Sequence, residues 1–151
     1  MRKKLLSACI VAALGGGFAA AALAQVKPET LVKQRQAAMT LQGKYFGPLV
    51  GMLKGNIPYD AAIVTRNAGF LDDLSQMPWD GFTDATKGVK TATLPAVWAE
   101  PAKFKQAQDQ LRTAVVALNA AAKGGNEGAV KAAIGDVGKA CGACHDNFRE
   151  K

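Results

Sequence analysis

The sequence is poor in residues that bind metals or form disulfides. It contains a single histidine, His145, and three cysteines among 151 residues. Because Cys9 lies in a segment that we expect to be removed, the mature protein keeps only Cys141 and Cys144 beside this histidine. Structural zinc sites usually take four Cys or His ligands, so three such residues are too few for one. A disulfide or a redox-active cysteine pair would leave the adjacent histidine without a role, and the chain also lacks the βαβ pattern of thioredoxin-like sites.

Positive charge is present but is neither strong nor clustered. The formal net charge of +7 includes Arg2, Lys3 and Lys4, and it falls to +4 once the expected leader is removed. Nucleic-acid binding usually needs basic residues gathered in a patch or stripe, whereas those of this chain are spread along its length. We therefore expect no nucleic-acid partner.

The first 24 residues have the form of an export signal. Basic residues precede an apolar run that starts at Leu5 and ends in Ala22-Leu23-Ala24. A run this rich in Ala and Gly, closed by a small-x-small site, is typical of a cleaved signal rather than of a membrane anchor. We expect residues 1–24 to be removed and residues 25–151 to form one domain, located in the periplasm and not bound to the membrane.

The chain does contain one conspicuous motif, Cys141-Gly142-Ala143-Cys144-His145, near its C-terminus. Two thiols three residues apart can each add to a haem vinyl group, and the adjacent imidazole can bind the iron. On a helix, residues three and four apart share a face, so both thiols and the imidazole would meet one flat ligand. The motif predicts a single covalently bound haem c, attached through Cys141 and Cys144, with His145 as the metal ligand.

Hydrophobic periodicity predicts an all-α chain with four long helices. The first helix is expected over residues 28–54, and the second from residue 58 or 59 to about residue 75. The third should begin between residues 95 and 101 and end at residue 124, and the fourth should run from residue 127 through the haem motif. The inner face of the second helix is expected to include Ile63, Phe70 and Leu74. Two short connections and one long one fit an antiparallel four-helix bundle, in which a cofactor lies between facing helices.

The long connection is expected over residues 77–94, which show neither helical nor strand periodicity. Gly, Thr, Asp and Pro are frequent in this segment, as is usual in loops. Trp79 and Phe82 are expected to pack this loop against the bundle.

Over essentially the whole mature length the chain resembles cytochrome c′, a family of class II c-type cytochromes. The resemblance rests on the position of the haem motif at the far C-terminus, where Asp-Asn-Phe-Arg149 follows it, and on the segment from Val32 to Met39. Residues 59–62, 74–79 and 135–138 also look similar. In class I cytochromes the motif opens the chain and a methionine ligand follows it, whereas every methionine here precedes His145.

The resemblance implies roles for three residues outside the motif. Met39 would cover the distal face of a five-coordinate iron without binding it. Arg35 would pair with a haem propionate, and Arg149, four residues beyond His145, would lie beside the imidazole. Simpler roles stay open for both arginines: Arg35 could be solvated, and Arg149 could only offset the helix dipole.

These features predict a periplasmic monohaem c-type cytochrome that binds nitric oxide or carbon monoxide at an occluded distal site, with electron transfer as a further role. The alternative is a low-spin electron carrier with Met39 as the sixth iron ligand. We expect no enzyme, because no second histidine or acid-base pair accompanies the motif, although slow turnover of nitric oxide stays open. By resemblance, the protein is expected to form a homodimer through its first two helices and to have a redox partner that the sequence does not identify.

Overall fold

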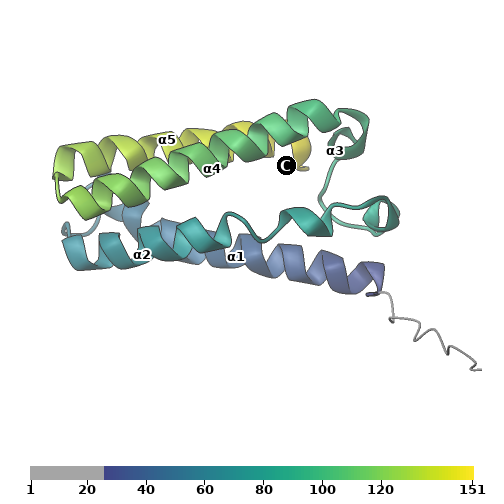
Figure 1. Ribbon diagram of the computed structural model, residues 1–151, viewed down its shortest axis with the longest axis horizontal. Helices are drawn as coiled ribbons and strands as arrows, with labels where there is room; N and C mark the ends of the chain where they lie inside the picture. Colours follow the sequence, from purple (N-terminus) through teal and green to yellow (C-terminus); the bar gives the residue numbers. More distant parts are fainter. Residues whose placement is uncertain (1–25) are drawn as a thin grey trace, which may run out of the picture.

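The computed structural model describes residues 26–151, and these form an antiparallel four-helix bundle. Its long helices are α1 (Pro28–Leu53), α2 (Ala61–Leu74), α4 (Pro101–Gly124) and α5 (Glu127–Phe148). Helices α1 and α2 make one layer, and α4 and α5 make the other (Figure 1). The expected fold class is therefore confirmed. The expected signal sequence lies outside the described residues.

Short helical turns occupy the long connection between α2 and α4. They are the 3₁₀ helices η1 (Trp79–Gly81) and η2 (Asp84–Thr86) and the short helix α3 (Ala96–Ala99). The loop is thus in its expected place, but its turns could not be predicted because each is too short to show a hydrophobic repeat. No helix in this part of the chain, residues 26–151, is both long and apolar enough to cross a membrane.

Polar side chains fix the starts of two helices. The Asp60 carboxylate accepts a hydrogen bond from the amide of Ile63 (3.0 Å) and begins α2, two to three residues later than expected. In the same way, the side-chain oxygen of Asn126 accepts from the amide of Ala129 (2.9 Å) and begins α5. Such caps satisfy amides that the first turn of a helix leaves without a partner.

The apolar interior consists of two clusters. The central core joins all four long helices through buried residues such as Leu49, Val64, Leu118 and Ile134. An aromatic cluster fills the end of the bundle where the long connection lies. Its members are Val97, Phe104 and Phe148, with Trp79, Phe82 and Trp98 packed against them. Trp79 and Phe82 are therefore loop anchors, as expected.

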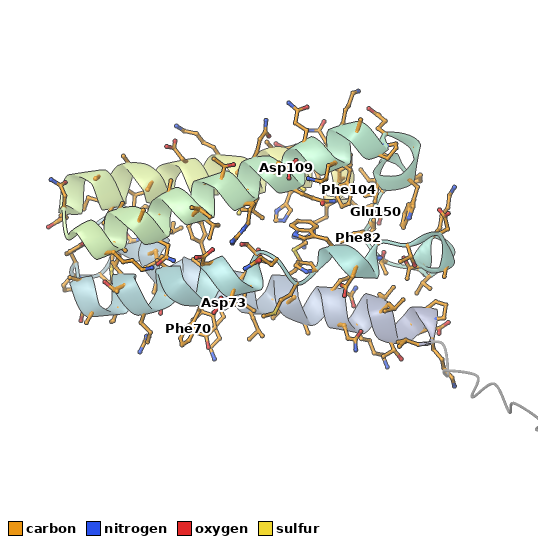
Figure 2. All side chains as sticks on the ribbon, in the orientation of Figure 1. Phe70, Asp73, Phe82, Phe104, Asp109 and Glu150 are labelled. Atoms are coloured by element: carbon orange, nitrogen blue, oxygen red, sulfur yellow. The ribbon has the colours of Figure 1, made fainter. Side chains whose placement is uncertain are left out.

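Phe70 was expected to face inward, and this expectation is wrong. Its side chain is 41% exposed and lies on the side of α2 away from α4 and α5 (Figure 2). It packs instead on Tyr45 of α1, with 4.7 Å between the ring centroids. The buried position on this part of α2 belongs to Asn67, whose amide group donates to the Tyr45 carbonyl (3.0 Å). A hydrophobic pattern does not find such a residue, because its burial depends on one hydrogen bond to another helix.

Candidate haem-binding site

The two cysteines of the motif lie near the end of α5, where the two apolar clusters meet. Cys141 packs against the central core and Cys144 against the aromatic cluster. Both side chains are half-buried, both are free thiols, and His145 is exposed. The structure therefore confirms that the motif is helical and presents two thiols together at the boundary of the interior.

Burial also governs the ionisation of these groups. Burial raises the pKa of the Cys141 thiol, and the nearby charge of Cys144 raises it further, against a backbone hydrogen bond that lowers it. Burial likewise raises the pKa of Cys144. Partial burial lowers the pKa of His145, the positive charge of Arg149 lowers it further, and Asp146 opposes both. The thiols and the imidazole are thus favoured in their neutral forms, because a low-polarity environment disfavours charge.

Met39 lies at the same level of the bundle as His145. Helix α1 contacts α5 at Phe46, whose ring would be 3.8 Å from a Cβ atom placed on Gly138. The two helices run in opposite directions with the same rise per residue (Figure 1). Seven residues back on α1 from Phe46 and seven forward on α5 from Gly138 lead to Met39 and His145. The side chain of Met39 is half-buried and shares the face of Phe46, since residues seven apart repeat on a helix.

Arg35 is buried at 3% exposure, so a solvated role for it is wrong. Its Nη1 donates to the Gly81 carbonyl (2.6 Å) and to the Thr86 hydroxyl (3.1 Å), and its Nη2 donates to the Thr93 hydroxyl (3.2 Å). The guanidinium also lies 4.2 Å from the centre of the Phe82 ring. Burial lowers the pKa of Arg35, the direction that desolvation imposes on a cation.

Arg149 follows α5 directly and is exposed. Its amide donates to the His145 carbonyl (3.1 Å), and its backbone is extended, with φ −132° and ψ 137°. Its positive charge contributes to lowering the pKa of His145, after the larger effect of burial.

Comparison with known proteins identifies the family. The family model described as Cytochrome C' matches residues 30–149, nearly the whole described chain. The chain belongs to the cytochrome c′ family. The cytochrome c′ of Alcaligenes xylosoxydans xylosoxydans is 43% identical over 125 residues, which is 83% of this chain and 97% of that protein.

Solved structures of cytochrome c′ share the fold. The crystal structure from Rubrivivax gelatinosus gives a TM-score of 0.79 at 41% identity and covers 82% of this chain and 98% of that one. A nitric oxide complex and a carbon monoxide complex of variants of the Alcaligenes xylosoxidans protein each give a TM-score of 0.77 at 43% identity, covering 83% of this chain and 98% of theirs.

The residues of this cytochrome c′ family member fit the cofactor of the family, a covalently bound haem c. Cys141 and Cys144 are the two thiols of its attachment motif, and their free, half-buried side chains can form the two thioethers. The environment of Arg35 supports the same conclusion. Among residues 26–151 no carboxylate forms an ion pair with it, and buried charges are usually paired. A haem propionate would supply that missing negative charge.

Sequence reasoning did not find the partners of Arg35. Gly81, Thr86 and Thr93 lie 46, 51 and 58 residues further along the chain. Each occurs in a loop whose residue types are common in any loop, so no local signal marks them. Only the tertiary fold brings them to α1.

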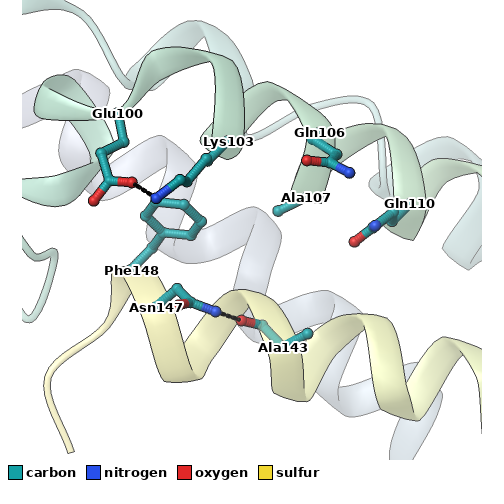
Figure 3. Close-up of a pocket in the computed structure, with 8 residues that line it drawn as sticks. All are labelled: Glu100, Lys103, Gln106, Ala107, Gln110, Ala143, Asn147 and Phe148. Carbon is teal, nitrogen blue, oxygen red and sulfur yellow. Dashed lines mark hydrogen bonds and ion pairs between the residues drawn. The ribbon is translucent and has the colours of Figure 1, made fainter.

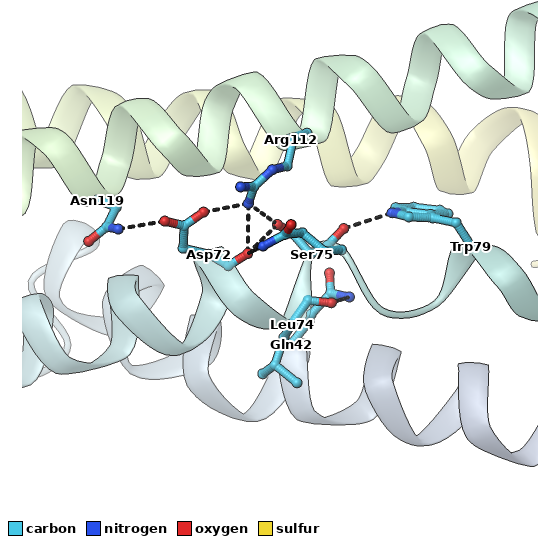
Figure 4. A network of polar contacts seen from close by, with 8 residues as sticks. Gln42, Asp72, Leu74, Ser75, Trp79, Arg112 and Asn119 are labelled. Carbon is cyan, nitrogen blue, oxygen red and sulfur yellow. Dashed lines mark hydrogen bonds and ion pairs between the residues drawn. The ribbon is translucent and has the colours of Figure 1, made fainter.

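Sequence reasoning also missed a polar network between α2 and α4 (Figure 4). Arg112 forms an ion pair with Asp72 and donates to the Ser75 hydroxyl (3.0 Å). The amide group of Asn119 donates to the second carboxylate oxygen of Asp72 (2.7 Å). The Ser75 carbonyl accepts from the Trp79 indole (2.7 Å), so the network ends at the aromatic cluster.

A surface hollow near the end of α5 touches the motif only at Ala143 (Figure 3). Its walls come from α4, from Glu100 before it and from the last turns of α5, where Ala143, Asn147 and Phe148 line it. A second hollow lies between α4 and α5 further along. Neither is lined by Cys141, Cys144 or His145, so neither is the haem site.

Proposed function

We propose that the protein is a periplasmic monohaem cytochrome c′ that binds nitric oxide or carbon monoxide at the vacant distal side of a five-coordinate iron. Cys141 and Cys144 hold the haem, His145 is the axial ligand, and Arg35 pairs with a propionate. When bound, the haem iron supplies a reversible binding site for a small neutral gas.

One inference from the helix register carries this proposal: the apolar side chain of Met39 on α1 lies near the level of His145 on the neighbouring helix α5. His145 is the only histidine of the sequence, so no second imidazole can bind the iron or donate to a bound gas. An apolar wall without a donor suits nitric oxide and carbon monoxide, which need no hydrogen bond, better than oxygen. The gas complexes of the Alcaligenes xylosoxidans relatives support the same assignment.

The test is to add each gas to the purified, reduced holoprotein and to record its optical spectrum. We expect the Soret band to change with carbon monoxide and with nitric oxide, and the spectrum before gas is added to be that of high-spin iron. A reduced spectrum that neither gas alters would contradict the proposal.

A second proposal concerns assembly, and it rests on the exposed apolar side chains of α1 and α2. Leu41 and Phe70 are 39% and 41% exposed, and Met77, just after α2, is 55% exposed. We propose that these residues form the interface of a homodimer, because a second copy would remove this apolar surface from water.

We also propose that the mature protein is located in the periplasm. The composition of residues 1–24 supports export and removal of this segment, which leaves residues 25–151 in the periplasm. The partner that would exchange electrons with the haem is not identified by any residue pattern in the chain.

A further inference from the structure

The end of the chain is tied to the long loop by backbone hydrogen bonds. We call residues 91–94 the strap. The amide of Leu94 donates to the Phe148 carbonyl (3.0 Å), and the amide of Glu150 donates to the Ala92 carbonyl (2.8 Å). Figure 2 places Glu150 and the loop at the same end of the bundle. The two bonds therefore hold the chain on both sides of the residue between Phe148 and Glu150.

That residue is Arg149, and Thr93 pairs with it in an isolated antiparallel bridge. The amide of Arg149 is held as well, because it donates to the His145 carbonyl (3.1 Å). Although the side chain of Arg149 is exposed, its backbone has little freedom. The direction in which the side chain leaves the backbone is thus fixed by the strap.

The strap is itself anchored to α1. Its Thr93 hydroxyl accepts from Nη2 of Arg35 (3.2 Å). The loop also approaches α1 closely at Gly81, where an added Cβ atom would lie 2.9 Å from Arg35 Cβ and 3.0 Å from the Leu31 carbonyl oxygen. A path of direct contacts therefore runs from α1 through the loop to the residue that follows α5.

The register of α1 and α5 agrees with this path. The antiparallel alignment of the two helices sets Met39 near the level of His145. Four residues back from Met39 and four residues forward from His145, the same alignment sets Arg35 near the level of Arg149. Thr93 occupies the position between them. Arg35 and Met39 are one helical turn apart on α1, so the strap ties the face of α1 that bears Met39 to the side of the motif that bears Arg149.

We propose that the strap is a positioning element in which Thr93, held by Arg35, keeps the guanidinium of Arg149 beside His145. This inference rests on the proposed role of His145 as axial ligand and adds a means by which the loop controls that ligand. The strap thereby keeps a positive charge next to the exposed imidazole. Residues that support a metal-ligating histidine commonly affect the metal in this way.

Thr93→Val is the informative variant, because valine keeps the branched shape of threonine and replaces only the hydroxyl, with a methyl group. Arg35 is less suitable, since its replacement would also remove the proposed propionate contact. In the Thr93→Val holoprotein we expect the amides of Leu94 and Glu150 to exchange hydrogen about tenfold faster, the effect of losing one charge-assisted hydrogen bond. We also expect the ring-proton NMR resonances of His145 to shift.

The control is Thr65→Val. The Thr65 hydroxyl donates to the carbonyl of Ala61 within α2 (2.9 Å), is exposed, and has no bond to the loop or to α5. In this variant, neither the hydrogen exchange of the Leu94 and Glu150 amides nor the NMR resonances of His145 should change.

A double-mutant cycle with Arg149→Gln separates positioning from a merely structural role. If the strap acts through Arg149, Thr93→Val should shift the His145 resonances in the wild-type background and leave them unchanged in the Arg149→Gln background. Resonances that do not move, or that move equally in both backgrounds, would overturn the inference even if exchange is faster. None of these measurements needs a gas, so failure of gas binding would be recognised separately.

Discussion

Arg35 is the residue on which the long-range contacts around the haem motif converge. It is buried, and three of its five N–H groups bond to uncharged oxygens of the loop. Desolvating a cation is costly, and neutral partners offset only part of that cost. Two donors remain for an anionic group. One side chain can therefore hold the loop and pair with a propionate at the same time.

Met39 decides between the proposed gas binder and the low-spin electron carrier. If Met39 covers the iron without binding it, Met39→Leu should leave the spin state unchanged, and Met39→Ala should speed carbon monoxide binding because it removes the wall over the iron. If Met39 is a ligand, Met39→Leu should abolish a low-spin signal. Electron paramagnetic resonance and flow mixing with carbon monoxide measure both effects.

Met77→Leu is the matched control, because Met77 is 55% exposed and lies in the loop after α2. This variant should change neither the electron paramagnetic resonance spectrum nor the rate of carbon monoxide binding. Carbon monoxide kinetics that are equal in Met39→Ala and in the wild type would argue against Met39 lying over the iron.

At the scale of elements, α2 and α4 are joined across the two layers by charge as well as by apolar packing. Asp72 accepts from Arg112 and from Asn119, and Arg112 also donates to the Asp72 carbonyl (2.7 Å). The Oδ1 atom of Asn119 is buried and has no hydrogen-bond partner among residues 26–151. A network with one oxygen already unsatisfied has little tolerance for the loss of another member.

Removal of the Asp72 carboxylate should therefore destabilise the bundle. Asp72→Ala leaves the side-chain amide of Asn119 without its acceptor and removes the charged partner of Arg112, which keeps only the Asp72 carbonyl and the Ser75 hydroxyl. This loss costs about 1–3 kcal/mol of the free energy of unfolding. Denaturant unfolding of the holoprotein measures the change. Asp73→Ala is the control, because Asp73 is the exposed neighbour and should change stability by less than about 0.5 kcal/mol. If the two variants changed the free energy of unfolding equally, the network around Asp72 would contribute nothing to stability.

At the scale of the whole molecule, exposed apolar side chains are distributed unevenly. Leu41, Leu53 and Phe70 lie on the layer made by α1 and α2, whereas α4 contributes one large exposed apolar residue, Val116. The packing of Phe70 on Tyr45 makes part of this surface a continuous contact between two helices. An interface between copies of the chain is the arrangement that buries it.

Phe70→Lys should weaken the proposed homodimer, since a charge would have to be desolvated in the interface. Sedimentation velocity over a range of concentrations should show a shift from dimer toward monomer. Val116→Lys introduces the same charge at a residue that is 45% exposed on α4 and should leave the dimer intact. A wild-type protein that stays monomeric at all concentrations would contradict the assembly, though not the haem site.

Most of the fold could be predicted from the sequence because long amphipathic helices carry a repeated signal. Helix α1 ends within one residue of its expected limit, and α5 begins at the expected cap. Phe70 was expected inside, but Asn67 is buried instead, because its hydrogen bond to the Tyr45 carbonyl on another helix outweighs hydrophobicity at this position. The short turns of the loop gave no periodic signal at all.

The sequence by itself determined the cofactor, because two thiols and an imidazole at fixed spacing on one helix are a local property of five consecutive residues. It could name Arg35, Met39 and Arg149 only by resemblance. The tertiary structure decided where those three lie: Met39 level with His145, Arg35 buried in the loop, and Arg149 held by the strap. These positions depend on contacts between residues about 50 or more apart, and such contacts exist only once the helices have packed.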